Sequence, residues 1–149
     1  MGGVQRPHEQ VYLHELKAAA ERAGVEGRIR FLGQREDVSR LLAAADIHCQ
    51  PNTGPEPFGI AFVEALEAGL PVLTTRMGGA VEIVTETCGI LVPHDDAVAL
   101  AEACSRLIDE PALRKSLGAA GPRRAEEICG PGVVLPRLGA ILSSLTVNG

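Results

Sequence analysis

The sequence PNTGPEPFGIAFVEALEAGLPV, which runs from Pro51 to Val72, carries two glutamates, Glu56 and Glu64, with seven residues between them. A loop rich in proline and glycine precedes the first glutamate, and an apolar helix is expected across the second. This order places Glu56 at a loop tip and Glu64 a turn or two into the helix. The free backbone N–H groups at the start of that helix form a site for an anion such as a diphosphate. Two carboxylates that flank such a site suit a ligand with hydroxyls at both ends, for example a nucleotide sugar.

Strands and helices are expected to alternate along the chain. Helices are predicted over residues 9–23, 37–45, 58–68, 81–84 and 95–108, and strands over residues 28–33, 46–50, 71–75 and 89–92. Two further helical stretches follow, interrupted at Gly121-Pro122 and at Gly130-Pro131-Gly132. Because each strand is an apolar run, the pattern predicts an α/β fold, a Rossmann-like parallel sheet with helices on both faces. We expect a single, partial domain over residues 1–149, with its core at 9–108 and C-terminal helices at 111–145.

Ligands of such sheets bind at the carboxyl ends of the strands. This rule places three predicted loops, residues 33–36, 51–57 and 75–79, on one rim of the sheet. All three are rich in glycine, proline and small polar residues, as expected of loops that contact a ligand through their backbone. The segments on the opposite rim are short, so the sequence predicts that one rim serves a ligand.

The composition argues against some classes of function. Apolar residues make up 46% and charged residues 22% of the chain, so it can build a core. The formal net charge is −5 and the basic residues are scattered, so neither nucleic acid nor an anionic membrane is expected as a partner. No apolar run approaches the roughly 20 residues of a membrane span, and no secretory signal is recognisable. We therefore predict a cytoplasmic chain without a membrane-spanning segment.

The cysteines and histidines give little sign of chemistry. The four cysteines are widely spaced in apolar surroundings and form no C-x-x-C pair, which is typical of small buried hydrophobes in a reducing compartment. No histidine falls at metal-ligand spacing or pairs with a serine or cysteine as in a nucleophilic site, so no metal site is expected. The cysteines are Cys49, Cys88, Cys104 and Cys129.

A set of short motifs occurs in a fixed order along the chain. They are RIRFLG at 28–33, then Asp37-Val38, Leu41-Leu42 and Ala45-Asp46, EPFGI at 56–60, EAL at 64–66, GLPV at 69–72, GG at 78–79, EIV at 82–84 and GILVP at 89–93. Together they resemble the C-terminal domain of retaining family 4 (group 1) glycosyltransferases, from about Tyr12 to Leu107. Taken alone, Glu56 could be a favourable charge at a helix N-terminus and Glu64 a solvated helix residue. The ordered set favours the family.

The resemblance implies two Rossmann-like domains with a cleft between them, of which this domain holds the nucleotide-sugar donor. Glu56 would face the transferred sugar and the positive charge that develops at its anomeric carbon, and Glu64 would accept hydrogen bonds from the ribose hydroxyls. Gly59, Ile60 and Ala61 would donate backbone hydrogen bonds to the diphosphate. The other donor-site residues it implies are Gly33, Gln34, Phe58, Gly78 and Gly79. The family needs no metal or other cofactor, because the helix dipole and basic side chains neutralise the diphosphate. Retention is attributed to departure and attack on the same face within an ion pair.

The sequence departs from the family pattern at its N-terminal side. The Arg and Lys that grip the diphosphate, the first two strands and the acceptor domain would all lie upstream of Gly2-Gly3. Missing central strands would leave inner sheet edges unpaired, which predicts strand rearrangement, a homo-oligomer, or a partner chain that supplies the missing half.

Two classes of function follow. The first is the donor-binding part of a hexosyltransferase, inactive on its own. The alternative is a non-catalytic module, derived from the same half-fold, that binds a nucleotide or a partner protein. A third candidate, a non-hydrolysing nucleotide-sugar epimerase, shares the two-domain architecture, but the Glu-Pro-Phe-Gly context at 56–59 argues against it.

Overall fold

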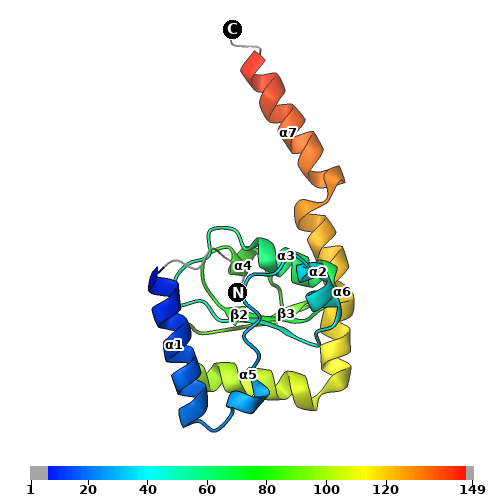
Figure 1. Ribbon diagram of the computed structural model, residues 1–149. Coiled ribbons are helices and arrows are strands. Elements are labelled where there is room, and N and C mark those ends of the chain that lie inside the picture. The colour runs from blue at the N-terminus through cyan, green and yellow to red at the C-terminus, as the bar shows by residue number, and fades with distance from the viewer. Residues whose placement is uncertain (1–6, 147–149) are drawn as a thin grey trace. The chain divides into compact units, whose positions relative to one another are not determined.

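The computed structural model describes the backbone of residues 7–146 and the side chains of residues 10–145. The chain divides between Val38 and Ser39 into two compact units, each described here by itself. The first unit contains helix α1 (Pro7–Arg22) and a 3-10 turn (Glu26–Arg28), and it ends where helix α2 (Val38–Ala43) begins. The second unit contains the sheet and the remaining helices (Figure 1).

The strand predicted over residues 28–33 is not formed, and this prediction was wrong. Ile29 has extended backbone angles (φ −109°, ψ 133°), but no strand among the described residues pairs with the segment. Its apolar side chains are also exposed, by 42% at Ile29, 42% at Phe31 and 52% at Leu32. A strand is stabilised by main-chain bonds to a neighbour. The apolar pattern of residues 28–33 favours an extended backbone, but no neighbouring strand pairs with this segment among the described residues.

The second unit is built on a parallel sheet, as the sequence predicted, and this sheet has three of the four expected strands. In sheet order these are β1 (His48–Gln50), β2 (Val72–Thr75) and β3 (Gly89–Val92). Val72 lies opposite His48 on one side and opposite Gly89 on the other. Helix α3 (Ile60–Glu67) connects β1 to β2, and helix α4 (Ala80–Ile83) lies between β2 and β3. Each parallel pair is therefore joined through a helix, which is the βαβ arrangement.

Helices cover both faces of the sheet. Side chains of a strand point alternately to opposite faces, and in β2 Val72 enters one apolar cluster while Leu73 enters another. The first cluster contains side chains from α3, from α4 and the loop after it, and from helix α6 (Pro111–Cys129). They are Phe62, Leu66, Ile83, Val84, Cys88 and Ala125. The second gathers Val92, Ala103, Leu107 and Leu117 around helix α5 (Ala97–Asp109). In Figure 1, α3 and α5 lie on opposite sides of the strands.

Helix α6 (Pro111–Cys129) continues through Gly121-Pro122, where the sequence predicted a break. It crosses α3 closely, because a Cβ on Gly121 would lie 2.5 Å from the carbonyl oxygen of Leu66. One on Gly118 would lie 2.3 Å from the carbonyl oxygen of Gly69. This packing offsets the cost of a proline inside a helix, and the Pro122 ring faces solvent. The second predicted break is confirmed, since α6 ends at Gly130 and α7 (Pro131–Thr146) follows.

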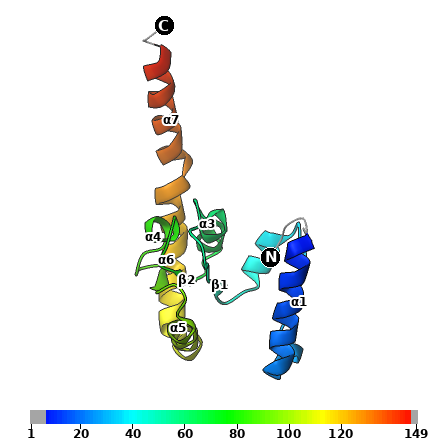
Figure 2. The same ribbon diagram turned by 90° about the vertical axis from the view of Figure 1, so that its left-hand side faces the viewer.

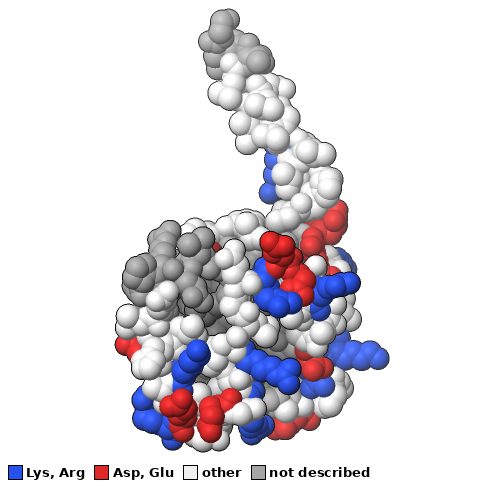
Figure 3. Space-filling view, viewed as in Figure 1, with Lys and Arg blue, Asp and Glu red and all other residues white. Residues whose placement is uncertain are grey.

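Helix α7 continues beyond the sheet and the other helices of its unit (Figures 1 and 2). Six of its apolar side chains are exposed: Val134, Leu135, Leu138, Ile141, Leu142 and Leu145. Arg137 is its one charged residue, and Figure 3 shows a nearly uncharged surface over most of its length. α7 therefore presents an apolar surface that nothing in the described part of the chain covers.

One helical stretch of the described residues, Pro111–Leu145, is long and apolar enough to cross a membrane by length and composition, with a window of mean hydropathy 1.5 that is 6% buried. The expectation that no such segment exists is therefore not supported. That expectation counted unbroken apolar runs, which Pro136 and Arg137 interrupt, whereas the mean hydropathy is taken over a longer window of α6 and α7 that includes both residues. A single stretch of this kind does not by itself establish a membrane span.

The cysteines are all free thiols, and one of the four is buried as predicted. Cys88 is buried, and Cys104 and Cys129 are half-buried. Cys49 is exposed, contrary to the prediction. It lies on β1 at the edge of the sheet, and α5 covers β2 and β3 instead.

Candidate functional site

The loop from Pro51 to Gly59 leaves the carboxyl end of β1 and is tied to the end of β2 by two threonines. The N–H of Asn52 donates to Thr75 Oγ1 at 3.1 Å, and the same hydroxyl donates to the Asn52 carbonyl at 2.9 Å. Thr74 Oγ1 donates to the carbonyl of Gln50 at 2.8 Å. The carboxyl ends of β1 and β2 thus share one rim, as predicted.

Glu56 is held in place by the Gly78-Gly79 turn that follows β2. The N–H of Gly79 donates to the Glu56 carbonyl at 2.7 Å. Gly78 has φ 57°, and a Cβ there would lie 2.4 Å from the Glu56 carbonyl oxygen and 2.6 Å from its nitrogen. Only glycine permits this approach without a shift of the loop. The structure brings these three predicted site residues together.

The Glu56 side chain is half-buried, and no hydrogen bond or ion pair to it occurs among the described residues. A Cβ on Gly59 would lie 3.4 Å from Glu56 Cγ, so this carboxylate lies close to the start of α3. A carboxylate without a protein partner can interact with positive charge on a ligand.

Helix α3 begins at Ile60, four residues after Glu56. Gly59 is its N-cap residue, with φ 96° and ψ 51°, and no side chain caps the helix. The Gly59 carbonyl accepts from Phe62 N–H at 2.9 Å, which leaves the N–H groups of Ile60 and Ala61 without an intrahelical partner. Ile60 is exposed and Ala61 half-buried, and Phe58 is exposed before them. Uncapped N–H groups at a helix start bind anions.

Glu64 is exposed on α3, one turn beyond Ile60, and it acts electrostatically on His48 of β1. Burial lowers the pKa of His48, while a hydrogen bond with Gln50 and the charge of Glu64 act in the opposite direction. The His48 ring meets the Phe62 ring edge-on, with centroids 6.2 Å apart. Along the chain, Glu56 thus precedes the free N–H groups at the start of α3, and Glu64 follows them.

Sequence reasoning gave no role to two buried polar atoms next to this rim. His48 Nε2 and Asn52 Nδ2 are buried and lack a hydrogen-bond partner among the described residues. Asn52 could have been noticed as the one amide side chain in the loop of residues 51–59. His48 carried no signal, since an isolated histidine in a strand is usually structural.

Gly33 and Gln34 belong to the first unit, so their place in this site stays a prediction. Gly33 has φ 66° and is exposed, and a Cβ on it would meet no atom within 4 Å. Its conformation is that of a turn residue.

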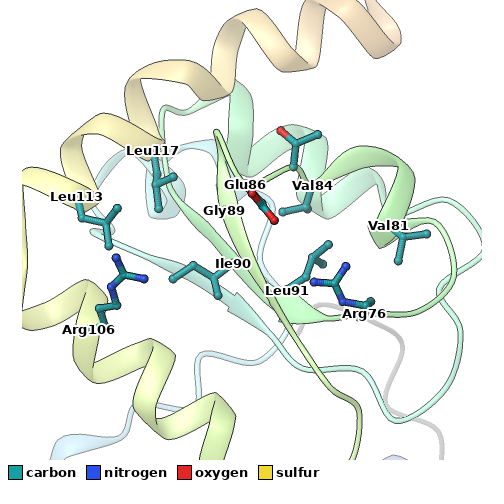
Figure 4. Close-up of a pocket in the computed structure, with 11 residues that line it drawn as sticks. Arg76, Val81, Val84, Glu86, Gly89, Ile90, Leu91, Arg106, Leu113 and Leu117 are labelled. Carbon is teal, nitrogen blue, oxygen red and sulfur yellow. The ribbon is translucent and has the colours of Figure 1, made fainter.

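One cavity lies beside β3, an edge strand of the sheet in the described residues (Figure 4). It has a volume of about 540 Å³, with Arg76 and Arg106 at its sides and Ile90, Leu91 and Leu117 among its apolar walls. Another cavity, of about 220 Å³, is lined in part by Phe58 and Gly79 of the candidate site. Neither of these two cavities is lined by Glu56 or Glu64. Over the described residues, no three His, Cys, Asp or Glu side chains are grouped as a metal site requires.

The fold is that of an α/β protein in which an uncapped helix N-terminus lies beside the carboxyl edge of a parallel sheet. Within that class, the family described as "Glycosyl transferases group 1" matches residues 2–124. The chain belongs to the group 1 glycosyltransferases.

Curated relatives are glycosyltransferases of greater length. The phosphatidyl-myo-inositol mannosyltransferase of Mycobacterium leprae is 38% identical over 110 residues, which are 72% of this chain and 29% of that protein. The lipopolysaccharide glucosyltransferase WaaG of Escherichia coli K12 is 40% identical over 79 residues, 52% of this chain and 21% of WaaG. The chain thus spans less than a third of the length of these relatives.

Solved structures of such enzymes superpose on the chain. Anabaena HepE in complex with UDP gives a TM-score of 0.88 at 31% identity, over 93% of this chain and 38% of HepE. HepE in complex with UDP-glucose gives 0.85 at 32% identity, over 91% of this chain and 38% of HepE. The C-terminal domain of the group 1 protein LpcC from Francisella tularensis gives 0.71 at 24% identity, over 82% and 64% of the two chains, and shows the common fold. The predicted GT-B-type Rossmann-like fold is confirmed.

Proposed function

We propose that this chain is the donor-binding part of a glycosyltransferase that moves a hexose from a nucleotide-diphosphate sugar to an acceptor with retention of configuration. The observation that carries the proposal is the uncapped start of α3, with its free N–H groups at Ile60 and Ala61. Along the chain, Glu56 precedes these groups and Glu64 follows them. The relatives named above as mannosyl- and glucosyltransferases support the class of sugar, and the UDP and UDP-glucose held by HepE support the class of donor.

Each part of the site has a role in the proposed reaction. The N–H groups of Ile60 and Ala61, aided by the α3 dipole, stabilise the negative charge that the diphosphate gains as its bond to the sugar breaks. Glu56 stabilises the positive charge at the anomeric carbon without forming a bond to it. Glu64 accepts hydrogen bonds from the ribose. The resemblance described above supports departure and attack on one face of the sugar, without a metal ion.

The whole reaction requires more than this chain provides. The chain spans about a third of its relatives, and acceptor recognition belongs to the rest of such a protein or to a complementing chain. We therefore expect the isolated chain, which we place in the cytoplasm, to bind a donor without transferring its sugar.

Calorimetric titration with UDP, GDP and ADP, and with their glucose or mannose conjugates, tests the proposal. We expect one nucleotide to bind, and its dissociation constant to rise about tenfold in Glu64→Ala, which removes a charged hydrogen-bond acceptor. Glu67→Ala is the matched control, because Glu67 is exposed on the same helix outside the site. A folded chain that binds none of these ligands would contradict donor binding and would leave the non-catalytic partner-binding module as the better account.

A further inference from the structure

A charged side chain of α6 holds the last turn of α4. Arg124 donates from Nε to the carbonyl oxygen of Ile83 at 2.9 Å and from Nη2 to that of Glu82. The Arg124 side chain is 24% exposed, and its Nη1 lies 3.6 Å from Glu127 Oε2. Carbonyls at the C-terminal end of a helix carry partial negative charge and lack intrahelical partners. A guanidinium with two donors satisfies both of them.

Hydrogen bonds continue from these carbonyls to the Glu56 loop. α4 is a helix of four residues, and the N–H of Ile83 donates across it to the carbonyl of Gly79 at 3.1 Å. The N–H of Gly79 donates in turn to the carbonyl of Glu56 at 2.7 Å. Three successive hydrogen bonds therefore connect the guanidinium of Arg124 to the main chain of Glu56.

Helix α4 packs against the core through its buried Ala80 and Ile83 side chains, and it borders a cavity on another side. The cavity of about 220 Å³ lies beside it and is lined by Phe58, Gly79 and Ile83, with Glu127 and Ile128 on the α6 side. A single helical turn is not stable by itself, so its position depends on its partners. The two Arg124 hydrogen bonds add a polar constraint to this packing at the C-terminal end of α4.

We propose that Arg124 is a positioning residue that sets the place of Glu56 through α4 and Gly79. The inference rests on the proposed function, in which Glu56 faces the transferred sugar. Loss of the two hydrogen bonds frees Gly79 and, with it, the Glu56 loop. Binding of the sugar then weakens more than binding of the nucleotide.

Amide hydrogen exchange of the whole chain gives a readout that needs no ligand. Arg124→Met keeps the aliphatic stem and removes both donors, and Arg123→Met is the control, because Arg123 is exposed and pairs with Glu127 of its own helix. In Arg124→Met we expect the Gly79 amide to exchange about tenfold faster than in the wild type, while the β2 amides stay protected. Unchanged exchange at Gly79 would overturn the proposal.

Titration gives the second readout. The ratio of the dissociation constants for UDP and UDP-glucose, or for the equivalent pair that the wild type prefers, measures what the sugar contributes. We expect Arg124→Met to shift this ratio about fivefold against the sugar, and Arg123→Met to leave it unchanged. An unchanged ratio in Arg124→Met would overturn the positioning role. If the wild type binds neither ligand, the proposed function fails, and exchange at Gly79 still decides whether Arg124 holds the loop.

Arg124→Lys serves if the methionine variant does not fold. Lysine keeps the charge but lacks the planar fork that reaches both carbonyls. Its Gly79 amide should exchange faster than in the wild type, with the β2 amides protected. Exchange equal to the wild type would count against the proposal.

Discussion

The main-chain N–H of Gly79 donates a hydrogen bond of 2.7 Å to the carbonyl oxygen of Glu56, so the loops that follow β1 and β2 meet at one point. Gly78 approaches the same residue so closely that a Cβ would lie 2.4 Å from that oxygen. The position of Glu56 is therefore set by the backbone of a neighbouring loop as much as by its own.

Gly78→Ala should displace the Glu56 loop. The added methyl would collide with the backbone of Glu56, and alanine is strained at φ 57°. We expect the free energy of unfolding to fall by about 1–3 kcal/mol and the dissociation constant of the nucleotide sugar to rise. Urea denaturation followed by calorimetric titration measures both.

Gly54→Ala is the control for this substitution. Gly54 lies in the loop that carries Glu56, and a Cβ on it would meet no atom within 4 Å. Its stability and binding should match the wild type. Equal losses of stability and binding in both variants would show that the close contact between Gly78 and Glu56 does not cause them.

The glutamate pair and its helix could be predicted from the sequence because local rules determine them. Proline and glycine before Glu56, apolar periodicity across Glu64 and Gly69 after the helix are all readable within one stretch. The ties of this stretch to the rest of the fold are not local. The hydrogen bonds of Thr75 to Asn52, and of Arg124 to Ile83, join residues far apart in the chain. The periodicity of the sequence does not predict these long-range hydrogen bonds.

The two errors in predicted structure have the same origin. Residues 28–33 have the composition of a strand, but pairing decides whether a strand forms, and no partner lies among the described residues. Gly121-Pro122 has the composition of a break, but Gly121 packs against Leu66 and the helix continues. In both cases a tertiary contact, present or absent, outweighs the local preference.

Pro122→Ala should stabilise the chain. Pro122 lies inside α6, where it has no N–H to donate and its ring crowds the preceding turn. We expect the free energy of unfolding to rise by about 1–3 kcal/mol, measured by urea denaturation. Pro111→Ala, at the first position of the same helix, should give no such gain, because the missing N–H has no partner there. A destabilised Pro122→Ala would mean that the proline ring contributes packing that outweighs the lost hydrogen bond.

Acidification should weaken the fold through His48. Burial lowers its pKa in the folded chain, so the folded state takes up a proton less readily than the unfolded state. The contribution of His48 to the free energy of unfolding is therefore fully present above about pH 6.5, the pKa of histidine in the unfolded chain. It is lost as the pH falls from there towards the lower pKa of the folded chain. Urea denaturation at several pH values between these limits should show this loss in the wild type.

His48→Gln should flatten that dependence, since glutamine does not titrate. His14→Gln is the control, because His14 is exposed on α1. If the free energy of unfolding of His48→Gln depends on pH as steeply as that of the wild type, other groups cause the effect.

The apolar side chains of α7 should make the isolated chain self-associate. Leu135, Leu138, Leu142 and Leu145 are spaced three and four residues apart, so they form one stripe along the helix, and each is at least 48% exposed. An exposed apolar stripe gains free energy when a second surface covers it. We expect the sedimentation coefficient to rise with protein concentration.

Leu138→Glu, which places a charge in the centre of the stripe, should shift this rise to higher concentration. Ala140→Glu adds the same charge to the same helix on a different face, so it should leave association unchanged. If the wild type sediments as a monomer at every concentration, α7 does not drive association. If both variants dissociate the chain equally, net charge acts rather than the stripe. Only a difference between the two variants assigns the association to the leucine face of α7.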